Sequence, residues 1–113
     1  MKWNTLQHAE QLEQIRNESK LKRVLIFKHS TRCNISRASL DRLERNWKDD
    51  ELTDIKLYFL DLITYRSISN LVANEFDVEH ESPQVLIIEN EKSIYDRSHF
   101  DIDYQQIQAV LKN

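Results

Sequence analysis

The chain has 113 residues, a formal net charge of −3 and 40% apolar residues. This length and composition fit one small domain, residues 1–113, with a modest core, and the lack of a basic bias argues against a nucleic-acid partner. We expect no membrane association, because no apolar run approaches the roughly 18 residues of a spanning helix, and no secretory signal is visible. One cysteine cannot form an intrachain disulfide, so we expect a reducing, cytoplasmic location.

Apolar residues recur at helical spacing in residues 5–19, which predicts a first helix. Asn4 is placed as its N-cap, with Gln7 three residues later to complete a capping box. The apolar positions of this pattern are Leu6, Ala9, Leu12 and Ile15.

Two short apolar runs predict buried strands, "VLIF" at residues 24–27 and "IKLYFLDL" at residues 55–62. Between them we expect a helix that begins near Cys33 or Asn34 and ends near residue 48. Its core-facing stripe consists of Ser36, Leu40, Leu43 and Trp47.

A third helix is expected at residues 64–76, followed by a polar loop that contains the only proline, Pro83. Residues 84–97 predict two strands around a turn at Asn90–Glu91, and Asp103 is placed to cap a final helix. The order α-β-α-β-α-β-β-α predicts an α/β fold with a four-stranded mixed sheet and helices on both faces.

Glycine is absent from the whole chain. Gly-rich phosphate loops and the dinucleotide fingerprint are therefore excluded, and a nucleotide-binding enzyme is not expected. Turns must depend on residues such as Asn and Asp, which tolerate the left-handed conformation best after glycine.

The single cysteine, Cys33, lies where the first predicted strand turns into a helix. Ligands of open α/β sheets bind outside the carboxyl ends of the strands. A helix N-terminus and nearby cations stabilise a thiolate, and Lys28, His29 and Arg32 precede Cys33 closely, with no acid in residues 24–40. We expect a reactive thiolate, assisted by a hydrogen bond from the Ser36 hydroxyl. The alternative is a buried, inert cysteine, since free cysteines are often buried.

A second cysteine would act as a resolving thiol, but the corresponding position of the Cys-x-x-Cys pattern holds Ser36. Any redox cycle must then use one thiol: Cys33 takes a small thiol from a mixed disulfide and an external thiol releases it. Oxidation to a sulfenic acid is the competing chemistry, and it too would need an external resolving thiol.

Pro83 stands directly before a predicted strand, a position where proline is allowed. From the residues alone we expect a trans bond at Ser82–Pro83, because most X–Pro bonds are trans.

Five stretches of the chain carry a resemblance to a known family: "VLIFKHSTRC", "LERNW", "YFLDLITYRSISN", "HESPQVLII" and "SHFDI". Over residues 3–111 the sequence resembles the YtxJ-type monothiol bacilliredoxins of the thioredoxin superfamily. The resemblance implies a thioredoxin-like fold and thiol–disulfide exchange with proteins that carry the small thiol bacillithiol. It makes Cys33 the nucleophile, Ser36 the non-resolving residue and Ser82–Pro83 a cis-proline loop facing the thiol.

The sequence departs from the family pattern at three positions. Asn34 stands where a proline or small residue is common, which could change the fit of the substrate, and Asp77 and Glu91 occupy places that tend to be glycine. The nucleophile itself is retained.

Further substrate contacts are expected from Arg32 beside the thiol, from His29 through positive charge or contact with a carboxylate, and from His99. The resemblance implies that Ser98 and His99 meet the carboxylates of bacillithiol. We expect no metal, since the four histidines are scattered, and no tightly bound cofactor, with bacillithiol acting as co-substrate. A non-catalytic binding module and a glutaredoxin-like iron–sulfur carrier remain alternatives.

Overall fold

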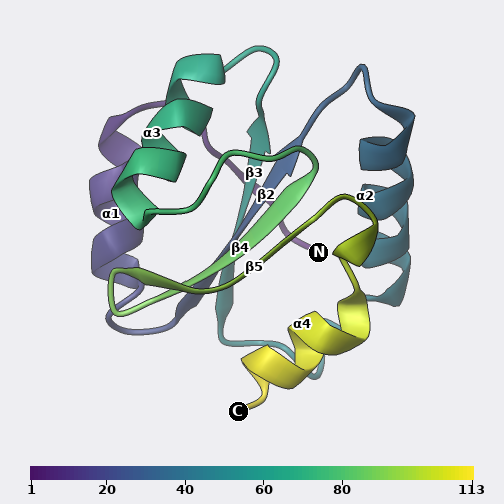
Figure 1. The fold of residues 1–113 in the computed structure, drawn as a ribbon. Helices are drawn as coiled ribbons and strands as arrows, with labels where there is room; N and C mark the ends of the chain where they lie inside the picture. Colours follow the sequence, from purple (N-terminus) through teal and green to yellow (C-terminus); the bar gives the residue numbers. More distant parts are fainter.

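A five-stranded mixed sheet forms the centre of the computed structural model, which describes all of residues 1–113 (Figure 1). The strand order is β1-β3-β2-β4-β5. Strands β1, β3 and β2 run parallel, whereas β4 is antiparallel to β2 and β5. The strands are β1 (Asn4–Thr5), β2 (Arg23–His29), β3 (Ile55–Asp61), β4 (Gln84–Glu89) and β5 (Lys92–Ser98).

Helices cover both faces of this sheet, as the sequence predicts (Figure 1). Helices α1 (Glu10–Glu18) and α3 (Arg66–Phe76) lie on one face. Helices α2 (Asn34–Asn46) and α4 (Tyr104–Leu111) lie on the other, and the short 3-10 turn η1 (His99–Asp101) leads from β5 towards α4.

Strand β2 is the centre of the core, because both of its faces are buried. Side chains alternate across a strand, so Val24 and Ile26 pack towards α1 and α3. Leu25 and Phe27 pack towards α2 and α4. Each fully buried side chain of this kind contributes roughly 1.5–3 kcal/mol of apolar burial, which explains why this run is almost entirely apolar.

The prediction of four strands is wrong, and so is the predicted start of the first helix. Asn4 does not cap a helix: with Thr5 it forms β1, which pairs with Tyr58 and Phe59 of β3, and its side chain donates to the Leu57 carbonyl. Helix α1 begins only at Glu10. Instead of Gln7, Gln11 satisfies the free N–H groups that precede the helix, since its Oε1 accepts from residues 7 and 8.

Three turn residues adopt the left-handed conformation that usually favours glycine. Asp77 ends α3 with φ 53°, and Asn90 and Glu91 join β4 to β5 with φ values of 50° and 68°. Two of these, Asp77 and Glu91, are the positions where the sequence departs from a glycine pattern. The predicted hairpin turn is confirmed, and so is the Asp103 cap of α4, which accepts from the Gln105 N–H.

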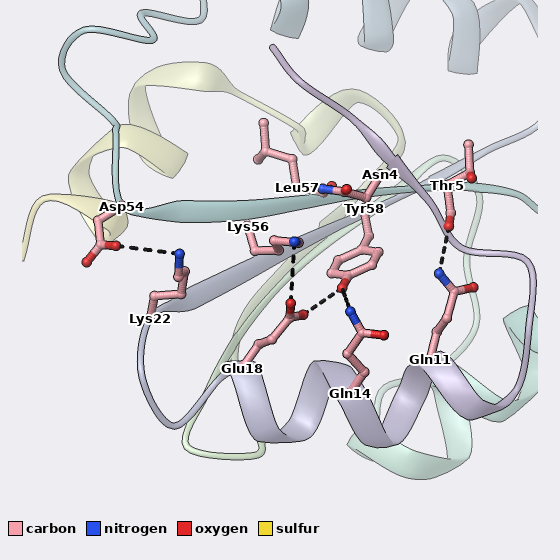
Figure 2. A network of polar contacts seen from close by, with 10 residues as sticks. All are labelled: Asn4, Thr5, Gln11, Gln14, Glu18, Lys22, Asp54, Lys56, Leu57 and Tyr58. Carbon is pink, nitrogen blue, oxygen red and sulfur yellow. Dashed lines mark hydrogen bonds and ion pairs between the residues drawn. The ribbon is translucent and has the colours of Figure 1, made fainter.

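Helix α1 is attached to the sheet by polar contacts as well as by apolar packing (Figure 2). The hydroxyl of buried Tyr58 donates to Glu18 Oε1 at 2.6 Å and accepts from the Gln14 side chain at 3.4 Å. Glu18 also lies 3.5 Å from the Lys56 ammonium group. Burial and then the contact with Glu18 raise the pKa of Tyr58 above its usual range, so the phenol keeps its proton.

None of the helices is long and apolar enough to cross a membrane.

Candidate active site

The ends of four strands meet at one edge of the sheet, which we call the site edge. His29 at the end of β2 pairs with Asp61 at the end of β3. Gln84, the first residue of β4, pairs with both Lys28 of β2 and Ser98 of β5. The segments that follow β2, β3 and β5 and the loop that precedes β4 therefore lie together at this edge, which is where sequence reasoning places the site.

Cys33 is the N-cap residue of α2, as the strand-to-helix pattern predicts. Its backbone is extended (φ −114°, ψ 119°), and its carbonyl accepts the first helical hydrogen bond from the Arg37 N–H at 3.1 Å. The Cys33 N–H donates to the Ser30 carbonyl at 3.2 Å, and the side chain is half-buried. The thiol thus lies at the positive end of a 13-residue helix.

Ser36 does not donate to the sulfur, contrary to our expectation. Its side chain is fully buried beneath the first turn of α2. The Ser36 Oγ accepts from the Ser30 N–H at 3.0 Å and lies 2.7 Å from His29 Nδ1. Ser36 lies on the core-facing side of α2. Its hydroxyl therefore contacts the end of β2 and connects the helix to that strand.

His29 is a buried residue, and it does not supply the positive charge that we expected. Its ring lies 5.5 Å from the ring of Phe59 and 6.4 Å from that of Phe27, centroid to centroid. Burial is the main cause that lowers the pKa of His29 below 6.5, partly opposed by Asp61. The imidazole is therefore neutral at neutral pH, and it supports Ser36 rather than facing solvent.

Arg32 and Asn34 flank Cys33 and are both exposed. Both side chains are therefore accessible to an approaching molecule. Arg32 lies in the turn before α2, and Asn34 is the first residue of the helix.

The peptide bond Ser82–Pro83 is cis, as the resemblance implies and contrary to the expectation from residue statistics. The loop before β4 is held to its neighbours on two sides. The Pro83 carbonyl accepts from the His99 N–H at 3.0 Å, and the buried Gln84 side chain donates to the Glu79 carbonyl at 2.9 Å. The Ser82 hydroxyl is buried without a partner.

His99 lies at the site edge in the left-handed conformation (φ 55°). Its Nε2 is 3.2 Å from Glu81 Oε2, and about half of the side chain is exposed. The first turn of α4 is capped by Asp103. An anion at the His99 imidazole would also meet the Glu81 carboxylate.

A family model described as monothiol bacilliredoxin BrxC matches residues 4–107. The chain belongs to this family. The fold agrees: a solved structure described as a candidate oxidoreductase with a thioredoxin fold is 30% identical, with a TM-score of 0.79 over 96% of this chain and 92% of that chain.

Thioredoxins are similar in fold at much lower identity. The Trypanosoma brucei brucei thioredoxin is 13% identical, with a TM-score of 0.76 over 99% of this chain and 93% of its own. The Malassezia sympodialis thioredoxin is 16% identical, with a TM-score of 0.75 over 98% and 89% of the two chains. This bacilliredoxin-family chain therefore has a thioredoxin fold, and family and fold together support a thiol redox function.

Sequence reasoning missed a polar cluster beneath the site edge of this bacilliredoxin-family chain. Lys28 is fully buried, and its ammonium group contacts Ser69 and His80. Burial and the nearby Arg66 lower the pKa of Lys28 to about 8. The available signal was a lysine inside an otherwise apolar strand run, since an unpaired lysine is rarely buried in full.

The chain contains no group of three or more His, Cys, Asp or Glu side chains arranged to hold a metal ion. Cys33 is half-buried and carries the only thiol. The reactive group that this arrangement offers is a single sulfur beside a helix N-terminus.

Proposed function

We propose that the protein is a monothiol thiol–disulfide oxidoreductase that removes bacillithiol from S-bacillithiolated proteins. The observation that carries this proposal is the position of the only cysteine. Cys33 caps helix α2 at the site edge, and the residue three positions later is a buried serine instead of a second thiol.

The reaction has two exchange steps. In the first, the Cys33 thiolate attacks the bacillithiol sulfur of a mixed disulfide; the new S–S bond joins Cys33 to bacillithiol, and the substrate protein leaves as a thiolate. In the second, a free bacillithiol thiolate attacks the same sulfur, which releases Cys33 as a thiolate and forms bacillithiol disulfide. Each step breaks one S–S bond and makes another, so no further oxidant or reductant takes part.

Three features support the roles of individual residues. The helix N-terminus favours the attacking thiolate and the leaving Cys33 thiolate alike. Exposed Arg32 and Asn34 are available to contact the substrate beside the sulfur. The loop with Ser82 and Pro83 shares the site edge and borders the path of the incoming disulfide, with His99 next to it.

The test is to incubate the reduced protein with a model protein carrying a bacillithiol mixed disulfide, and in parallel with the glutathione equivalent. Intact mass spectrometry then shows whether either small thiol moves to this chain. We expect transfer of bacillithiol to Cys33 and much slower transfer of glutathione. The control is Cys33→Ser, which must show no adduct.

The outcomes separate the claims. Equal transfer of both thiols would retain the monothiol mechanism and remove the preference for bacillithiol. Full release of bacillithiol by Cys33→Ser would contradict the mechanism. No transfer to the wild-type chain would favour a binding module with an inert cysteine.

A further inference from the structure

Lys28 is a buried cation without an acidic partner. It is fully inaccessible in the last part of β2, and its Nζ lies 3.3 Å from the Ser69 carbonyl oxygen and 3.3 Å from His80 Nδ1. Both partners are neutral acceptors, and the charged side chain that acts on the Lys28 ammonium group is another cation, Arg66. A buried charge without a counter-ion opposes folding, so burial for stability alone does not explain this lysine.

The contacts of Lys28 connect three parts of the molecule. The backbone of Lys28 belongs to β2, and the Ser69 carbonyl belongs to α3. His80 belongs to the loop before β4, three residues ahead of Pro83. The Ser69 hydroxyl also lies 3.2 Å from the same His80 Nδ1. Lys28 and Ser69 therefore contact the same ring nitrogen of His80.

We propose that Lys28 is a positioning residue, which holds His80 and with it the loop of residues 79–83 in the place that thiol transfer requires. This inference rests on the proposed function, because the loop matters only if it borders the disulfide that Cys33 attacks. Lys28 itself lies beneath the sheet edge and touches no reacting atom. Its effect reaches the site through His80, the Gln84–Glu79 contact and Pro83.

The arrangement requires an unprotonated Nδ1 on His80. A neutral His80 can accept from Lys28 or Ser69, whereas the imidazolium form can only donate. Lys28 from β2 and Arg66 from α3 face His80 with positive charge, and Glu81 of the same loop opposes them. Burial, followed by these two cations, lowers the pKa of His80 below 6.5. Acidification through that range therefore removes the acceptor and places two cations against each other.

The experiment compares two rates on the intact protein: bacillithiol transfer from the model protein, and alkylation of Cys33 by iodoacetamide. Both need the Cys33 thiolate, but the small alkylating reagent does not need the loop. Their ratio therefore cancels any change in the reactivity of the sulfur itself and reports on the loop alone. The variants are Lys28→Met, which fills the same space without charge, and His80→Asn, whose Oδ1 can accept in place of Nδ1 but does not titrate.

We expect Lys28→Met to lower the ratio of transfer to alkylation by about tenfold, the rate change that corresponds to one typical hydrogen bond. The matched control is Lys56→Met, because Lys56 pairs with Glu18 far from the site edge, and it should leave the ratio unchanged. In the wild type the ratio should fall as the pH drops below about 6.5, the ordinary histidine pKa. In His80→Asn the ratio should stay constant over the same range.

Three results would overturn the inference: an unchanged ratio in Lys28→Met, an equal fall of transfer and alkylation in that variant, or the same acid decrease in His80→Asn as in the wild type. The last result does not depend on whether Lys28→Met folds well. Failure of the proposed function is distinct, since the wild-type chain itself would then transfer no bacillithiol.

Discussion

Ser36 links α2 to β2 through hydrogen bonds that water cannot easily replace, because the residue is fully buried. Ser36→Ala leaves the Ser30 N–H and His29 Nδ1 without their partner. We expect the free energy of unfolding to fall by about 1–3 kcal/mol, the usual effect of an unsatisfied buried donor. Chemical denaturation measures this, with Ser67→Ala on the exposed side of α3 as the matched control. Equal stability of the two variants would contradict the linking role of Ser36.

Lys28 gives the stability of the protein a specific pH dependence. Its pKa is about 8 in the folded chain against 10.5 in the unfolded chain, so the unfolded state binds more protons between these values. Stability contributed by this residue therefore rises with pH from about 8 to 10.5, by up to about 3 kcal/mol. Below pH 8 the full cost of the buried charge remains.

The measurement is the difference in unfolding free energy between the wild type and Lys28→Met at pH 7 and at pH 10. Other groups that titrate in this range are common to both proteins and cancel. We expect the unfolding free energy of the wild type to increase relative to that of the variant as the pH rises. A difference that is constant with pH would mean that Lys28 keeps its ordinary pKa.

Sequence reasoning located the thiol at the site, but it assigned its neighbours only in part. The position of Cys33 follows from a strand run that meets a helix pattern, and both signals are local. The partner of the Ser36 hydroxyl and the burial of His29 depend on how α2 packs on β2 and on the rings of Phe27 and Phe59. Such contacts depend on how a helix packs against a strand and produce no recognisable residue spacing in the sequence. The expected hydrogen bond from Ser36 to the sulfur was therefore wrong.

Among the elements, α1 depends on a polar attachment to β3 that includes the Tyr58 hydroxyl (Figure 2). Tyr58→Phe removes the 2.6 Å hydrogen bond to Glu18 and should lower the free energy of unfolding by about 1–2 kcal/mol. The control is Tyr65→Phe, which retains a partly buried ring of the same kind. Thiol transfer should be unaffected, because this attachment lies away from the site edge. A loss of transfer at constant stability would contradict this assignment.

The turn between β4 and β5 places Glu91 in the left-handed region at φ 68°. A residue with a Cβ is disfavoured there, and glycine is not. Glu91→Gly should raise the free energy of unfolding by about 0.5–1 kcal/mol, since the 3.9 Å contact that it loses with Lys20 is exposed and weak. Lys92→Gly in the adjoining strand is the control and should lower stability. A decrease in both variants would show that the ion pair outweighs the backbone strain.

The periodicity of apolar residues predicts the main elements and their order, but it does not predict β1. A two-residue strand is too short to produce an alternating pattern, and Leu6 has the right spacing to continue the helix. In the structure Leu6 directly follows β1, its N–H donates to the Phe59 carbonyl, and its side chain is buried in the core. The pairing partner lies more than fifty residues away, so only the folded sheet can reveal it.

On the scale of the whole molecule, one thiol in 113 residues means that the chain can start an exchange but cannot finish it alone. The proposed mixed disulfide of Cys33 and bacillithiol should therefore persist after excess substrate is removed. Added bacillithiol should release it at a rate proportional to its concentration, as followed by intact mass. Ser36→Cys provides the comparison, because a second thiol one helical turn away gives a route for release without external thiol. Release from the wild type at a rate independent of bacillithiol would contradict the monothiol cycle.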